Sequence, residues 1–128
     1  MKKNFIISAV TVCMLIFSSC SSDEDNNTSN SNDPILGKWF YFSLNNEEVS
    51  DCEKMTSIEF AVSGATTTET FEILTDDSCG RSSLTENTWT NKGDNIYTFN
   101  NLESKIEFFD NGNSFKISSG NIVYKKMQ

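Results

Sequence analysis

The 128-residue chain contains no histidine, and its basic side chains are few. Without histidine, the commonest general base is missing, so the usual nucleophile and base pairs of hydrolytic enzymes are not available. Lys and Arg together number 10 against 18 Asp and Glu, which gives a formal net charge of −8. So acidic a chain lacks the basic patches that bind nucleic acids or anionic lipid surfaces. We therefore expect a protein that is not an enzyme, needs no cofactor and binds no nucleic acid.

A hydrophobic run long enough to cross a bilayer is also missing. The longest apolar stretch, Phe5 to Phe17, covers 13 residues and is interrupted by Ser8 and Thr11. A membrane-spanning helix needs about 20 apolar residues, so this stretch is too short to be one. Lys2 and Lys3 precede it and small residues follow it, which is the pattern of a cleavable secretory signal.

The end of this segment, Phe17-Ser18-Ser19-Cys20, resembles the lipobox of bacterial lipoproteins. The resemblance implies that residues 1–19 are a signal peptide and that Cys20 carries acyl chains on its sulfur and amino group. Cleavage removes two lysines and no acidic residue, so the formal charge becomes −10. The following residues, Ser21 to Asp25, are similar to the surface-export signal of Bacteroidota lipoproteins. This similarity implies a lipid anchor in the outer membrane with the protein at the cell surface, whereas a plain acidic linker is the alternative.

Two segments follow the anchor. Residues 20–33 contain no large apolar side chain and are rich in Asn, Ser and acidic residues. Such a segment cannot offset the entropy lost on ordering, so we expect a flexible tether. Residues 34–128 are 95 in number, enough for one domain with a modest core.

The domain has the pattern of short β-strands, and no part of it shows sustained helical periodicity. β-Branched and aromatic residues recur at roughly ten-residue spacing, in segments around Trp39–Phe42, Ile58–Val62, Thr66–Ile73, Trp89, Ile96–Phe99, Ile106–Phe108, Phe115–Ile117 and Ile122–Tyr124. Turn signals separate these segments, at Ser63-Gly64, Lys92-Gly93-Asp94, Asn111-Gly112 and Ser119-Gly120-Asn121. The sequence predicts an all-β domain of about eight antiparallel strands closed into a small up-and-down barrel. An open two-sheet sandwich is the alternative.

Two cysteines remain once Cys13 is lost with the signal and Cys20 is acylated. In an oxidising compartment, an isolated pair such as Cys52 and Cys79 forms a disulfide far more often than a metal site or a nucleophile. The bridge would join the segment before the second predicted strand to the turn after the third.

The first strand carries a family resemblance. Gly37-Lys38-Trp39 is similar to the Gly-x-Trp motif of lipocalins, and residues 35–126 resemble the short lipocalin-like lipoproteins of Bacteroidota. That wider resemblance rests on Ile35-Leu36-Gly37-Lys38-Trp39, Cys52, Ile58-Glu59-Phe60, Cys79 and Trp89. It implies that Gly37 and Trp39 pack across a closed barrel end. It also implies that Lys125 or Lys126 covers the indole in a cation–π contact.

Aromatic residues are the candidates for a binding site. An eight-stranded barrel is just wide enough to be filled by side chains or to hold one small ligand. We expect an apolar or amphipathic small molecule inside, lined by some of Phe60, Phe71, Trp89, Tyr97, Phe99, Phe108 and Phe115, and above all by Trp89 and Tyr97. Packing of these rings into a solid core is the alternative.

Acidic residues suggest a different class of function. Glu47, Glu48, Asp51 and Glu53 cluster in the first long loop, and a Cys52–Cys79 bridge would bring Asp76 and Asp77 near them. The spacing of a calcium loop is absent, so we expect a solvated rim and no metal site. Such a rim would suit a protein-interaction or inhibitor module that engages a basic partner, which is the alternative function.

Overall fold

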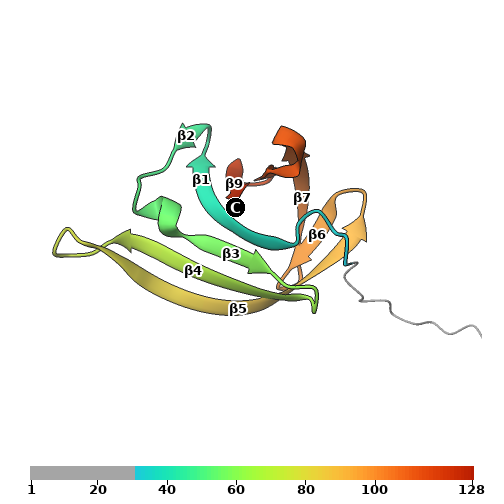
Figure 1. The fold of residues 1–128 in the computed structure, drawn as a ribbon, viewed down its shortest axis with the longest axis horizontal. Coiled ribbons are helices and arrows are strands. Elements are labelled where there is room, and N and C mark those ends of the chain that lie inside the picture. Colours follow the sequence, from blue (N-terminus) through green and yellow to red (C-terminus); the bar gives the residue numbers. More distant parts are fainter. Residues whose placement is uncertain (1–30) are drawn as a thin grey trace, which may run out of the picture.

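The computed structural model describes residues 31–128, shown as a ribbon in Figure 1. The predicted signal peptide, the predicted acylation site Cys20 and the predicted linker up to residue 30 lie outside the described residues. Within residues 31–128, no helix is both long enough and apolar enough to cross a membrane.

The strands form one closed antiparallel barrel. Eight of them pair with their neighbours along the chain, and β1 also pairs with β9, which closes the sheet. They are β1 (Gly37–Leu44), β3 (Ser57–Phe60), β4 (Ala65–Ile73), β5 (Cys79–Gly93), β6 (Ile96–Phe99), β7 (Leu102–Phe109), β8 (Ser114–Ile117) and β9 (Ile122–Lys126). A two-residue strand, β2 (Glu47–Glu48), extends the edge of β1. The prediction of an all-β up-and-down barrel of about eight strands is confirmed, and the β1–β9 pairing rules out the open sandwich.

Short polar turns connect several of the strands. Asn45-Asn46, Asp94-Asn95 and Asn100-Asn101 each hold two consecutive residues at positive φ, between 48° and 68°. Two-residue hairpin loops of type I′ require this conformation at both positions, and their twist matches that of the flanking strands. Asn and Asp tolerate it better than other residues with side chains. The first and third of these turns carry no glycine, and the sequence analysis did not identify them.

One end of the barrel is filled with side chains. Seven residues that are at most 3% exposed form the core, namely Ile35, Trp39, Phe60, Trp89, Tyr97, Ile106 and Phe115. The rings meet edge to face, with centroids 4.8 Å apart for Trp39 and Phe115 and 5.9 Å apart for Phe60 and Trp89. We call this part of the barrel the closed end.

The segment before β1 is bonded into the closed end. Asp33, which the sequence analysis assigned to the linker, is only 7% exposed. Its carboxyl group accepts hydrogen bonds from the Tyr97 hydroxyl at 2.9 Å and from the Asn91 amide at 2.7 Å. The Trp39 indole N–H donates to the Ile35 carbonyl at 2.6 Å. The ordered domain therefore includes Asp33, because buried polar groups need these partners.

The disulfide between Cys52 and Cys79 is present, with Cα atoms 5.5 Å apart. Cys52 precedes the 3₁₀ turn η1 (Glu53–Met55), which leads into β3, and Cys79 opens β5 after the turn from β4. The prediction of this bridge and of the two segments that it joins is confirmed.

Candidate ligand-binding site

The aromatic residues proposed from sequence to line a ligand lie mostly in the closed end. Phe60, Trp89, Tyr97 and Phe115 are fully buried, and Phe99 and Phe108 pack against them. Phe71 lies apart from this cluster on β4, opposite Arg81 of β5. The structure thus brings six of the seven together, but these six rings pack against one another and fill the space between them.

The strand register shows which side chains face the barrel interior. Residues directly opposite each other in neighbouring strands share a face of the sheet. Buried Trp39 lies opposite Ile58, Ile58 opposite Thr68, and Thr68 opposite Thr85. Thr85 therefore points to the same inner face as Trp39, and yet it is exposed. The inner wall is accessible to solvent at β5.

The exposure of this wall follows from the pairing of β5. The strand has 15 residues, but β6 pairs only with its last part, between Trp89 and Gly93. In the described part of the chain, the first part of β5 pairs with β4 alone. Figure 1 shows the β4–β5 hairpin reaching beyond the rest of the barrel. The inner wall of the barrel is consequently uncovered along the first part of β5. We call this region, with the part of β4 that pairs with it, the open end.

Hydroxyl and amide groups dominate the exposed inner wall. Alternation along each strand places every second residue on the inner face. The inward residues beyond the core are half-buried Thr68 and Thr70 on β4 and exposed Ser83, Thr85 and Asn87 on β5. This wall can donate and accept hydrogen bonds, and it offers little apolar surface.

Two tyrosines contribute aromatic surface on the other strands of the barrel. Tyr41 of β1 lies opposite Tyr124 of β9, with ring centroids 5.8 Å apart. Tyr124 stacks on Phe115 at 5.1 Å, so the tyrosine pair adjoins the aromatic core of the closed end. Both tyrosines are half-buried rather than fully covered. Aromatic faces joined to polar tips, together with a hydroxyl-rich wall, can accommodate an amphipathic molecule.

Burial changes the acidity of all three tyrosines. Loss of solvent raises the pKa of Tyr124 to about 12, and the nearby Tyr41 adds to this effect. The pKa of Tyr41 is raised by burial and then by the neighbouring charge of Glu53. The pKa of Tyr97 is raised by burial, with a further contribution from its hydrogen bond to Asp33. Each phenol stays neutral in the folded protein because its charged form is poorly solvated.

We expect little tyrosinate absorbance when the folded protein is taken through pH 10, the ordinary pKa of the side chain. Unfolded chains lose the proton near pH 10, whereas Tyr124 keeps it to about pH 12 in the fold. The unfolded state then binds fewer protons, so the free energy of unfolding falls as pH rises through this window. Spectrophotometric titration with and without denaturant measures the difference. Coincident titration curves would contradict the burial of these phenols.

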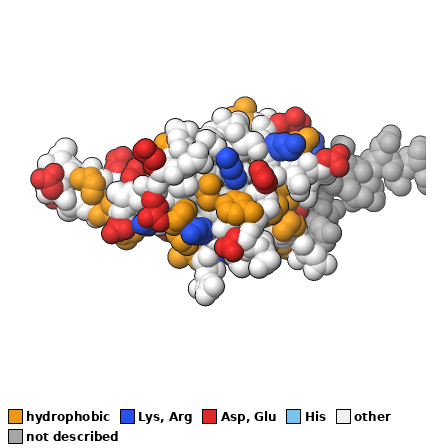
Figure 2. Space-filling model, turned by 90° about the horizontal axis from the view of Figure 1, so that it is seen from above, with side chains coloured by type: hydrophobic (Ala, Val, Ile, Leu, Met, Phe, Trp, Pro, Cys, Tyr) orange, Lys and Arg blue, Asp and Glu red, His pale blue; other side chains and the backbone are white. Residues whose placement is uncertain are grey.

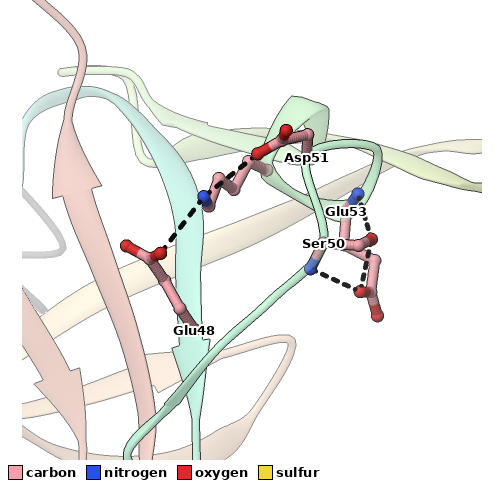
Figure 3. Close-up of polar contacts among 5 residues, drawn as sticks. Glu48, Ser50, Asp51 and Glu53 are labelled. Atoms are coloured by element: carbon pink, nitrogen blue, oxygen red, sulfur yellow. Dashed lines mark hydrogen bonds and ion pairs between the residues drawn. The ribbon is translucent and has the colours of Figure 1, made fainter.

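The acidic loop is partly neutralised by its own lysine (Figure 3). Lys54 forms ion pairs with Glu48 at 3.5 Å and with Asp51 at 3.2 Å. Glu53 accepts hydrogen bonds from the backbone N–H and hydroxyl of Ser50, which lower the pKa of the Glu53 carboxyl. These contacts fold the loop onto itself and leave less of its charge free for a basic partner.

The face shown in Figure 2 carries acidic, basic and hydrophobic side chains side by side, without one broad patch of basic residues. Among residues 31–128, no three His, Cys, Asp or Glu side chains lie in an arrangement that could hold a metal ion.

The first-strand motif lies at the closed end. Gly37 has a φ of +108°, a region that glycine adopts without strain, and a side chain there would approach Lys126. The Lys126 ammonium lies 4.9 Å from the centroid of the Trp39 ring, whereas Lys125 lies over Phe42. Of the two lysines named from sequence, Lys126 therefore covers the motif tryptophan.

Sequence reasoning missed the accessible inner residues. Tyr41, Thr68 and Tyr124 were expected only as strand residues, and Thr85 fell in no predicted segment, because the largest apolar side chains were taken as the candidates. Counting every second residue from Trp39 would have placed Tyr41 on the inner face. No sequence signal marks Thr85, because its exposure depends on where β6 begins to pair.

The chain matches no protein-family model, and no curated protein matches it.

Proposed function

We propose that this protein is a lipoprotein tethered to the outer membrane through acylated Cys20, displayed at the cell surface, whose barrel binds a small amphipathic molecule at the open end. The observation that carries the proposal is the contrast along the inner face. At Trp39 the inner face is buried among packed side chains, and at Thr85 it is exposed to solvent. Because side chains fill the closed end, the accessible inner wall at the open end is the part of the interior that a ligand can contact.

The chemistry of the open end favours an amphipathic ligand over a purely apolar one. Tyr41 and Tyr124 present ring faces, and Thr68, Thr85 and Asn87 present hydroxyl and amide groups. An apolar molecule would leave these polar groups without partners, at a cost of about 1–3 kcal/mol for each buried group. A ligand with a ring or short chain and a polar head satisfies both surfaces.

The position of the tether suits this function. Asp33 is bonded into the closed end, so the chain from Cys20 joins the barrel there. The β4–β5 hairpin reaches away from that side of the molecule (Figure 1). A lipid anchor at Cys20 would thus be joined to the barrel at the closed end, away from the surface proposed to bind the ligand.

Replacing the anchor cysteine tests the tether. We expect Cys20→Ser to release the protein from the membrane, because stable attachment requires more than one acyl chain and this acidic domain has little electrostatic attraction to lipid. Fractionation followed by carbonate extraction measures the change, with Cys13→Ser as the matched control inside the proposed signal. A Cys20→Ser protein that stays in the extracted outer membrane would refute the lipobox interpretation.

Ligand binding is tested on the full chain carrying Cys20→Ser. We expect N-phenyl-1-naphthylamine to give a saturable increase in its own fluorescence and dodecanoate to displace it. The fluorescence of the probe is the better readout because Trp39 and Trp89 are both buried in the closed end. Thr85→Arg, which places a bulky charge on the inner wall, should weaken binding about tenfold, or about 1.4 kcal/mol.

The matched control is Thr67→Arg. Thr67 is next to inward-facing Thr68 on β4 and points to the outer face, opposite Glu86. The same change of residue type there should leave the affinity unaltered. Equal loss of affinity in the two variants would place the probe elsewhere on the molecule. Absence of saturable binding to the unmodified barrel would instead favour the protein-interaction function.

A further inference from the structure

A concave site lies on the outside of the barrel. It has a volume of about 460 Å³ and is formed where the β3–β4 turn meets the outer face of β5, β6 and β7. This volume lies within the range of about 300–1,000 Å³ that is usual for small-molecule sites. Its lining includes Gly64, Thr90, Lys92, Thr98, Asn101 and Glu103. We call it the outer pocket.

The floor of the outer pocket is a row of hydroxyl groups held in register. Thr90 lies opposite Thr98, and Thr98 lies opposite Glu103, so these three side chains project from one face of three adjacent strands. The Thr90 and Thr98 hydroxyls are hydrogen-bonded to each other. Because that bond uses one of their two protons, the other hydroxyl proton and several lone pairs remain for a ligand.

The wall of the outer pocket is fixed by the backbone. The Trp89 N–H donates to the Gly64 carbonyl at 2.8 Å, which holds the β3–β4 turn against β5. The Trp89 indole N–H donates to the Ala61 carbonyl at 2.9 Å from the other side of the same turn. The Trp89 ring itself is 1% exposed. The pocket is therefore preformed, and its accessible lining is polar.

Two opposite charges flank the hydroxyl row. Lys92 and Glu103 are both exposed, and within residues 31–128 neither belongs to an ion pair. The ammonium group supplies donors, the carboxylate supplies acceptors, and Asn101 supplies both. One positive and one negative group give the pocket no preference for a net charge of either sign.

This lining selects a class of ligand. The outer pocket offers an apolar molecule no exposed ring or aliphatic surface to pack against. A phosphate or carboxylate group would be repelled by the Glu103 carboxylate. Sugar hydroxyls both donate and accept, and adjacent pairs of them can bridge neighbouring groups such as those of Thr98 and Glu103. A neutral polyhydroxylated molecule therefore matches the outer pocket group by group.

We propose that the outer pocket is a carbohydrate-binding site that accepts one end or one segment of a neutral glycan. It is separate from the open end, since Thr90, Thr98 and Glu103 point outward while Trp89 and its opposite residue Phe99 point inward. Carbohydrate binding there does not depend on the ligand proposed for the barrel interior.

The test follows backbone amide signals of the ¹⁵N-labelled full chain carrying Cys20→Ser. The probes are maltotriose, cellotriose and N,N′-diacetylchitobiose, with L-alanine as a zwitterionic comparison. We expect at least one saccharide to give saturable shifts centred on Gly64, Thr90 and Thr98 and not on Thr68 or Thr85. Glu103→Ala should weaken that saccharide about tenfold, because it removes a charged acceptor.

The matched control is Glu107→Ala. Glu107 is on the same strand, β7, is exposed like Glu103 and does not line the outer pocket. We expect this variant to bind the saccharide as the parent chain does. The proposal is overturned by an absence of saturable shifts with all three saccharides, by equal effects of the two variants, or by L-alanine binding in the pocket without any saccharide.

Discussion

Reduction of the Cys52–Cys79 disulfide should lower the free energy of unfolding by about 3–4 kcal/mol. On the chain-entropy model, the bridge stabilises the fold by restricting the unfolded chain, and the closed loop here spans a sequence separation of 27. The loss is a large share of the roughly 5–15 kcal/mol that keeps a domain folded. It should also fall on a particular region, because Cys79 begins the part of β5 that only β4 covers.

Urea unfolding of the oxidised protein and of a Cys52→Ser, Cys79→Ser double variant measures this difference. The double variant lacks both cysteines of the bridge, so the contribution of the bridge is measured without adding a reductant. Hydrogen exchange should accelerate first at β4 and β5 and last at the closed end. Equal midpoints for the two proteins would show that this loop is already restricted without the bridge.

Replacing Trp39 by alanine should destabilise the barrel by about 3–5 kcal/mol, the usual cost of removing a large buried ring. The side chain is 0% exposed, contacts Phe115 edge to face at 4.8 Å and donates its indole N–H to Ile35. Its loss would leave a cavity in the closed end and remove the surface over which Lys126 lies.

Phe40→Ala is the matched control, since Phe40 is the next residue and points outward, half-buried. It should cost about 1 kcal/mol, in proportion to the smaller apolar area that it covers. Denaturant unfolding of the two variants beside the parent chain measures both effects. Comparable losses at the two positions would mean that Trp39 does not organise the closed end.

The fold and the bridge could be read from local pattern. Alternation in segments such as Ile58 to Phe60 marks strands, because successive side chains of a strand point to opposite faces. Consecutive hairpins lead to a closed meander, since open edges must be paired or covered. Two cysteines left in a chain that is predicted to be exported imply one disulfide. These inferences succeed because each depends on neighbours along the chain or on simple counting.

The binding surfaces could not be read in the same way. The alternation of apolar and polar residues shows which side chains share a face of a strand. It does not show how far the neighbouring strand extends along that strand. Because β6 pairs with β5 only from Trp89 onward, Trp89 is buried, whereas inward-facing Thr85 is exposed. The sequence alone determined that this chain forms a small, disulfide-bonded β-barrel with aromatic rings to bury. Strand register and strand length, which are set by contacts between distant segments, decided which rings fill the closed end and which hydroxyls remain open to a ligand.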